Sequence, residues 1–268
     1  MRRLALNQSC FPGLSTARFL EAAAEAGADG VELRVVGSTE RREDVAAATR
    51  ACGLRVEAVN ALMDWALADD PDARPAVEGL IKLAVDVESP VVVCVAPIRE
   101  TRLPPRPQLE AAATDRLAAL AGLAATAGVR LALETVGRSS TRPGAESGIR
   151  RLADALRIAE AAGDEVQLIL DSYNIATAGE SFAAIGHIPL ARIALAQVAD
   201  RDPSTWERAL PGEGDLELEH FTHALAERGY EGAVSVELFP TEQPNDPTAF
   251  ARRALTAARS LESPARRS

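Results

Sequence analysis

Four side chains that can bind a metal ion or carry a proton each end a short apolar run. They are Glu134, Asp171, Gln197 and Glu237. Continuous apolar runs of this length are typical of strands in a parallel sheet that is buried on both faces. The carboxyl ends of parallel strands meet at one edge of a sheet, where α/β proteins place their chemistry. We therefore expect two glutamates, an aspartate and a glutamine oxygen to converge there.

An oxygen-rich set of this kind favours a hard divalent cation. Carboxylate and amide oxygens suit Mn²⁺ or Mg²⁺ better than Zn²⁺, which prefers imidazole and thiolate ligands. Without a cation, clustered carboxylates repel one another, and one of them has to hold a proton. The sequence therefore predicts a metal cofactor, with Mn²⁺ or Mg²⁺ favoured over Zn²⁺.

The elements that must position these residues alternate regularly along the chain. Apolar runs predict strands at 4–8, 30–33, 54–60, 91–95, 128–135, 167–171, 193–197 and 233–237. Helical periodicity and capping residues predict helices at 15–26, 39–52, 72–87, 109–127, 180–185, 217–228 and 247–261, with a further helix ending near 162.

Eight such βα units predict an α/β fold, a single-domain TIM (β/α)8 barrel over residues 1–262, followed by a frayed basic tail at 263–268. The alternative is a doubly wound open sheet. No Gly-x-Gly-x-x-Gly pattern follows the first predicted strand, so no dinucleotide-binding fingerprint supports that alternative.

Composition excludes several classes of partner. The net charge of −10 argues against nucleic acid, because phosphate contacts need a basic surface. No apolar run approaches the ~20 residues of a membrane span, and the first apolar stretch is too short for a signal peptide. The three cysteines show no paired or metal-ligand spacing, which favours a reduced, cytoplasmic protein. Homo-oligomerisation is left open.

Five segments carry more specific patterns: Leu-Ala-Leu-Glu at 131–134, Leu-Ile-Leu-Asp-Ser-Tyr at 168–173, Ala-Gln-Val-Ala-Asp at 196–200, Leu-Pro-Gly-Glu-Gly-Asp at 210–215 and Gly-Tyr-Glu-Gly-Ala-Val-Ser-Val-Glu at 229–237. Together they resemble the xylose-isomerase-like sugar isomerase and epimerase barrels. The resemblance covers nearly the whole chain, and its second half is the more specific part. The family often has histidine at the seventh-strand position, but its hydroxypyruvate-isomerase branch has glutamine there, which Gln197 resembles.

This resemblance implies roles for the four strand-end residues. Glu134, Asp171, Gln197 and Glu237 would hold the divalent metal. The metal would chelate a carbonyl oxygen and the adjacent hydroxyl and stabilise an enediolate. Glu134 and Glu237, on either side of the substrate, would act as base and acid.

The resemblance also implies contacts with the substrate. Arg208 matches a substrate-binding arginine of the family. Asn174 stands where the family frequently has histidine; its amide can hydrogen-bond a hydroxyl but cannot exchange a proton near pH 7. Glu32 and Asn60 end the second and third predicted strands, and for them a substrate contact and a structural role both stay open.

We therefore predict a metal-dependent sugar isomerase or epimerase that acts on a small sugar or keto acid. The main alternative is a metal-dependent dehydratase of a keto-inositol or dehydroshikimate type on the same barrel. A nuclease resembling endonuclease IV is disfavoured by the negative charge and by the total of three histidines. A non-enzymatic binding module is the remaining alternative, and failure to bind metal would be its signature.

Overall fold

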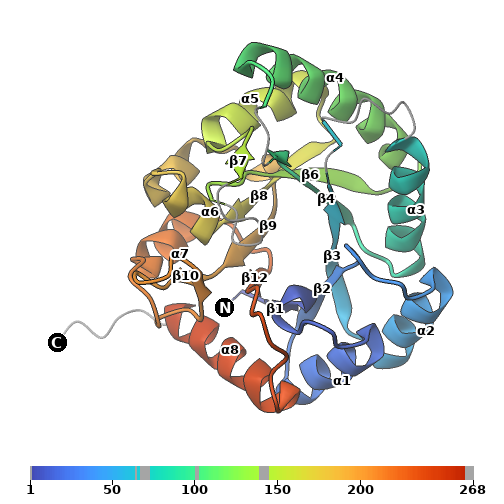
Figure 1. The fold of residues 1–268 in the computed structure, drawn as a ribbon, viewed down its shortest axis with the longest axis vertical. Helices are drawn as coiled ribbons and strands as arrows, with labels where there is room; N and C mark the ends of the chain where they lie inside the picture. The colour runs from blue at the N-terminus through green and yellow to red at the C-terminus, as the bar shows by residue number, and fades with distance from the viewer. Residues whose placement is uncertain (1, 64, 67–72, 100–102, 139–144, 263–268) are drawn as a thin grey trace.

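The chain folds into a closed barrel of parallel strands surrounded by helices, which Figure 1 views along the barrel axis. The structure is a computed structural model that describes residues 2–63, 65–66, 73–99, 103–138 and 145–262. The single-domain TIM barrel predicted from the alternation of strands and helices is confirmed. The frayed tail predicted at 263–268 lies outside the described residues.

Eight strands form the barrel, in the order β1-β12-β9-β8-β6-β4-β3-β2. Their bounds are β1 Leu4–Asn7, β2 Gly30–Arg34, β3 Arg55–Leu62, β4 Val91–Val95, β6 Arg130–Glu134, β8 Val166–Asp171, β9 Ile193–Val198 and β12 Val234–Val236. Every neighbouring pair is parallel, and Leu4 of β1 lies opposite Val234 of β12 where the ring closes. All the strands of the barrel match predicted ones, with ends shifted by a few residues.

The helices lie outside this ring (Figure 1). They are α1 Thr16–Ala26, α2 Arg42–Cys52, α3 Ala73–Asp86, α4 Arg106–Ala125, α5 Leu152–Ala162, α6 Ser172–Thr177, α7 Leu218–Glu227 and α8 Pro247–Glu262. α1 shows why the sequence signals worked: the Ser15 hydroxyl accepts the Arg18 amide at its start, and Gly27 ends it with φ of 81°.

Two features differ from the predicted helices. The segment predicted as a helix at 180–185 forms a 3₁₀ helix over Phe182–His187, where Gly186 and the nearby Pro189 oppose a longer α-helix. The helix α6 was not predicted, because six residues are too few to show a helical period.

Two short antiparallel pairs join the loops that follow the barrel strands. β5 (Ile98–Arg99) pairs with β7 (Glu146–Ser147), which links the loop after β4 to the loop after β6. β10 (Asp200–Arg201) pairs with β11 (Arg208–Ala209), which folds the loop after β9 back on itself. Strands of two residues carry no alternation, so neither pair was predicted from the sequence.

The core lies between the barrel and the helices, and the barrel strands contribute almost only buried residues to it. Buried polar side chains are concentrated at the carboxyl ends of the strands. Those at the strand ends include Asn7, Glu32, Asn60, Glu134, Asp171, Gln197 and Glu237, each 5% exposed or less. Among the described residues, the structure contains no helix whose length and hydropathy suit a membrane span.

Candidate functional site

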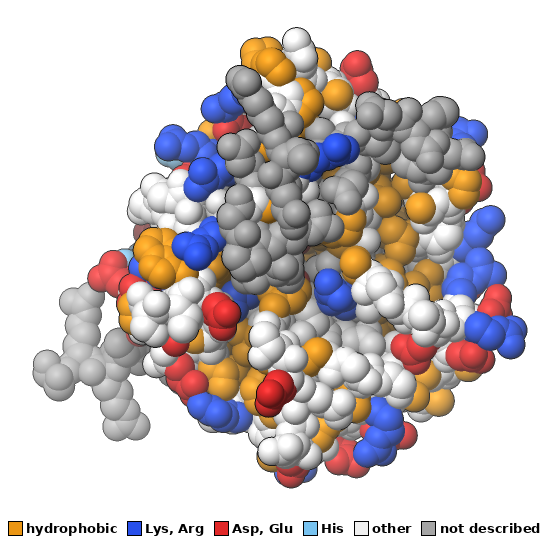
Figure 2. Space-filling view, in the orientation of Figure 1, with side chains coloured by type: hydrophobic (Ala, Val, Ile, Leu, Met, Phe, Trp, Pro, Cys, Tyr) orange, Lys and Arg blue, Asp and Glu red, His pale blue; other side chains and the backbone are white. Residues whose placement is uncertain are grey.

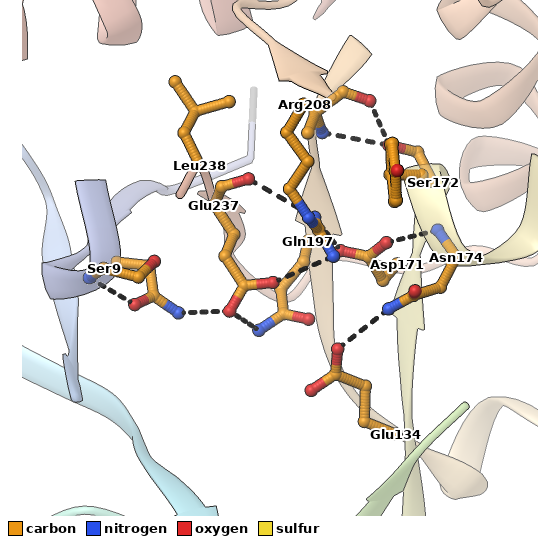
Figure 3. A network of polar contacts seen from close by, with 12 residues as sticks. Ser9, Glu134, Asp171, Ser172, Asn174, Gln197, Arg208, Glu237 and Leu238 are labelled. Atoms are coloured by element: carbon orange, nitrogen blue, oxygen red, sulfur yellow. Dashed lines mark hydrogen bonds and ion pairs between the residues drawn. The ribbon is translucent and has the colours of Figure 1, made fainter. Parts of the chain in front are cut away.

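The four residues predicted as metal ligands converge at the carboxyl ends of neighbouring strands (Figure 3). Glu134 ends β6, Asp171 ends β8, Gln197 lies in β9, and Glu237 directly follows β12. One carboxylate oxygen from each of the three acidic residues lies within 4.8 Å of the others. The Gln197 Nε2 atom is 3.4 Å from Glu237 Oε1.

Arg208 lies between two of these carboxylates, as Figure 3 shows. Its Nη1 donates to Asp171 Oδ2 at 2.7 Å, and its Nη2 is 3.4 Å from Glu237 Oε2. The guanidinium lies 4.7 Å from the centre of the Tyr173 ring and 5.2 Å from that of Phe239. The predicted substrate-binding arginine therefore also compensates the charge of the acidic cluster.

The loop that carries Arg208 is ordered by a single buried carboxylate. Asp200 accepts hydrogen bonds from the amides of Gly212 at 3.0 Å and Leu216 at 2.9 Å. Gly214 packs so closely that a Cβ atom there would lie 2.2 Å from the Arg201 carbonyl oxygen. The loop between β9 and α7 is thereby folded back over the barrel, with β11 holding Arg208 toward Asp171.

Asn174 is fixed by the turn that leaves β8. Asp171 caps α6, and its Oδ1 accepts the Asn174 amide at 2.6 Å. The Asn174 Nδ2 then donates to Glu134 Oε1 at 3.0 Å, while its Oδ1 accepts the Gly137 amide at 3.3 Å. The position that often holds histidine in the resembling family therefore carries a fixed donor to Glu134.

The remaining polar side chains orient Gln197 and Glu237. Gln197 Nε2 donates to Glu32 Oε2 at 2.9 Å, which leaves Gln197 Oε1 with no hydrogen-bond partner among the described residues. Glu237 Oε1 accepts from Asn7 at 2.8 Å and from Asn60 at 3.3 Å. Glu32 is fully buried beside Gln197.

A cavity opens above the acidic cluster. It is lined by Arg34, Val36, Asn60, Met63, Val95, Ile98, Glu134, Val136, Arg138, Asn174, Arg208, Glu237 and Phe239. Three of the four residues predicted to contact a substrate are in this lining, and Glu32 is not. Sequence reasoning did not single out Arg34, Arg138 or Phe239. Each lies at the end of a barrel strand or a few residues beyond it, and this position was the sequence signal that could have marked it as a cavity residue.

Burial dominates the electrostatics of the carboxylates. It raises the pKa of Glu134 well above the ordinary value, and the charges of Glu237 and Asp171 raise it further. It likewise raises the pKa of Glu237 to about 8, although Arg208 opposes this shift. Burial by itself lowers the pKa of Arg208, but Asp171 and Glu237 outweigh it, and the net shift is upward. The cluster therefore needs positive charge for all its carboxylates to be ionised.

The metal-free protein is expected to lose stability as the pH rises from about 4.5 to about 8. The pKa of Glu237 is about 8 when folded against an ordinary value of 4.5, so in this window the folded protein holds a proton that the unfolded chain has released. For one such proton, the free energy of unfolding falls by at most about 1.4 kcal/mol per pH unit.

Urea unfolding at several pH values within this window measures the effect. The Glu237→Gln variant cannot titrate at this position, so its stability should depend less steeply on pH than that of the wild type. Equal pH dependence in the two metal-free proteins would contradict the assignment of the shift to Glu237.

The residues present fit a divalent cation. Three buried carboxylates offer oxygens to a common point, and Gln197 Oε1 is a buried acceptor without a hydrogen-bond donor among the described residues. Such oxygens are the ligands of hard cations, and a buried acceptor without a donor can be satisfied by an ion or a water molecule. The three histidines take no part, since His220 and His223 are exposed on α7 and His187 ends a 3₁₀ helix.

Comparison with known proteins agrees with the fold and with the family resemblance of the sequence. The family model described as xylose isomerase-like TIM barrel matches residues 20–260. An inosose isomerase of Halalkalibacterium halodurans is 26% identical over 195 residues, which cover 69% of this chain and 67% of that protein.

Two solved structures share the fold over almost the whole chain. The IOLI protein with a binding zinc atom superposes with a TM-score of 0.82 and 23% identity, over 97% of this chain and 96% of that one. An L-ribulose 3-epimerase superposes with a TM-score of 0.76 and 23% identity, over 100% of both chains.

Proposed function

The chain belongs to the xylose isomerase-like TIM barrel family, and on that premise we propose that it is a divalent-metal-dependent sugar isomerase or epimerase. Relatives and structural neighbours named as isomerases and epimerases support an enzyme of this class. The observation that carries the proposal is the convergence of three buried carboxylates and the unpartnered Gln197 oxygen at the mouth of the barrel.

Glu134, Asp171, Gln197 and Glu237 are the residues that would hold the cation. When bound, a divalent cation supplies a Lewis acid that stabilises negative charge developing on a substrate oxygen. The zinc atom named for the IOLI structure supports a divalent metal but not the expected preference for Mn²⁺ or Mg²⁺.

Glu134 and Glu237 are the proposed proton-transfer groups for a carbon next to a carbonyl. Both line the cavity, and burial raises the pKa of each, to about 8 for Glu237, which favours a group that can hold a proton as well as release it. Removal of a proton from carbon by one glutamate gives an enediolate. Return of a proton to the opposite face of the same carbon by the other glutamate gives epimerisation. Return to the neighbouring carbon, with transfer of the hydroxyl proton to the former carbonyl oxygen, gives isomerisation. Asn174 Nδ2 fixes the rotamer of Glu134, and Asn7 and Asn60 fix that of Glu237.

The water-excluding walls of the cavity come from Val36, Val95, Ile98 and Phe239. Apolar walls exclude water from the reacting carbon and strengthen the electrostatic interactions inside the cavity. Arg208, held by Asp171, belongs to the same lining, where its positive charge stabilises negative charge on a substrate oxygen.

Exchange of solvent deuterium into a ketose is expected for the Mn²⁺-loaded protein in D₂O. A panel of ketoses, ketose phosphates and small keto acids is incubated with the protein, and mass spectrometry and NMR follow the label and the products. Protein treated with a chelator is the control, and it should not exchange label. Because proton transfer at carbon is common to isomerases and epimerases, label enters the substrate whichever of the two products forms.

Two results would contradict this function. Loss of water from the substrate, seen as a product lighter by the mass of one water molecule, would assign the dehydratase alternative, which shares the proton-removal step. Absence of both deuterium exchange and metal binding would instead indicate the non-enzymatic binding module.

A further inference from the structure

Arg34 is a half-buried arginine that makes no ion pair with any carboxylate of the described residues. It ends β2, its Nη1 donates to the Val36 carbonyl oxygen at 3.2 Å, and its guanidinium lies 5.8 Å from the centre of the Phe239 ring. Removing a guanidinium from water without a counter-ion costs free energy. Glu237 is near enough to act on this charge electrostatically but is not within ion-pair distance, so the guanidinium has room for a direct anionic partner.

The position of Arg34 relates it to the acidic cluster. It lines the same cavity as Glu134 and Glu237, so a ligand in this cavity lies among all three side chains. Arg34 and Arg208 both lie near the Phe239 ring, but only Arg208 is held by carboxylates of the described residues. Apart from the bond of its Nη1 to the Val36 carbonyl oxygen, the N–H donors of the Arg34 guanidinium have no acceptor among the described residues.

The charges around the cavity favour an anion at its outer part. The arginines in the lining are Arg34, Arg138 and Arg208, and the carboxylates in it are Glu134 and Glu237. Arg138 lies 5.3 Å from the centre of the Trp206 ring, on the exposed rim. Figure 2 shows basic side chains near the middle of the face viewed along the barrel axis. A cation held by the carboxylates would make the cavity more positive still.

We propose that Arg34 binds an anionic group of the substrate, a phosphate or a carboxylate. This proposal rests on the proposed function, which assigns the proton-transfer chemistry to the other end of the substrate. It narrows the substrate class to ketose phosphates and keto acids and excludes neutral sugars. A guanidinium binds either anion through two parallel N–H donors. The Phe239 ring, whose centre is 5.8 Å from the Arg34 guanidinium, forms a cation–π contact that helps to orient this guanidinium.

Binding of two simple anions, methyl phosphate and propionate, tests the proposal without requiring turnover. Calorimetric titration of the Mg²⁺-equilibrated protein compares wild type, Arg34→Gln, Arg34→Lys and a control, Arg18→Gln. Arg18 is exposed on α1 and pairs with Glu21, so its substitution changes the net charge equally at a distant place. A circular-dichroism melt verifies that each variant is folded.

The wild type is expected to bind at least one probe, and Arg34→Gln to weaken that binding by about tenfold or more, the scale of a charge-assisted hydrogen bond. Arg34→Lys keeps the charge but loses the two-donor edge, so it should be intermediate. Binding of methyl phosphate alone indicates a phosphate ester, and tighter binding of propionate indicates a carboxylate. Either outcome supports the anion site.

Unchanged binding in Arg34→Gln, or no binding of either probe to the wild type at millimolar concentration, would overturn the proposal. The outcome is separable from that of the proposed function. Deuterium exchange into a neutral ketose with no anion binding supports the proposed isomerase or epimerase function and contradicts the anion site. Anion binding through Arg34 with no exchange into any substrate supports the anion site and contradicts the proposed isomerase or epimerase function.

Discussion

Glu134→Gln and Glu237→Gln are each expected to lower turnover by at least ~10²-fold, the scale of general acid–base catalysis, while the protein still binds metal. Glutamine keeps the shape of the side chain and one oxygen but cannot accept or release a proton near neutral pH. Both carboxylates line the cavity, and both are nearly inaccessible to water. No bulk water therefore replaces the missing proton carrier.

The control for these variants is Glu213→Gln, the same chemical change at a half-exposed residue paired with Arg253. It should retain wild-type turnover. Steady-state rates and deuterium exchange give the turnover, and Mn²⁺ titration gives the metal affinity. If both variants exchange label at the wild-type rate and bind metal normally, the two-glutamate mechanism is wrong.

Asp171→Asn is expected to weaken Mn²⁺ binding by more than the ~10–100-fold found when an outer-shell partner of a metal ligand is removed. The change removes one charge from the ligand set, and it places an amide nitrogen where Arg208 Nη1 now donates. Arg208 then loses its closest counter-ion, and removing one member of a buried ion pair costs about 3–5 kcal/mol. The same variant should therefore also lower the free energy of unfolding.

Asp164→Asn provides the matched comparison, because Asp164 is fully exposed and pairs with Arg192, away from the acidic cluster. Calorimetric titration of chelator-treated protein measures metal affinity, and urea unfolding measures stability. Equal Mn²⁺ affinity in Asp171→Asn and Asp164→Asn would remove Asp171 from the ligand set.

The barrel could be predicted from the sequence because most of its strands are short runs in which apolar residues dominate. Val91–Val95 and Val166–Asp171 are buried on both faces, so their composition alone indicates a parallel sheet. The same burial makes a charged residue at the end of a run conspicuous. Glu134 and Asp171 were found in this way, and their convergence follows from the parallel order of the strands.

What surrounds the cluster could not be predicted, because it depends on contacts between residues far apart in the sequence. Asn7 and Glu237 are hydrogen-bonded across 230 positions, and no local pattern reports that pairing. Arg34 looks like any charged residue that ends a strand until the structure shows that it is half-buried and faces a cavity. The hairpin of β10 and β11, which brings Arg208 inward, is too short to have a period.

The pairing of β1 with β12 has a consequence for the order of assembly on the ribosome. Leu4–Asn7 are made more than 200 residues before their partner Val234–Val236, so one edge of the growing sheet stays unpaired during that interval. The Arg2 side chain, bonded to the Tyr230 carbonyl oxygen and to Glu262, joins the same two regions. Nascent chains that stop before residue 234 should therefore aggregate unless a chaperone covers that edge, which pelleting of stalled ribosome complexes can measure.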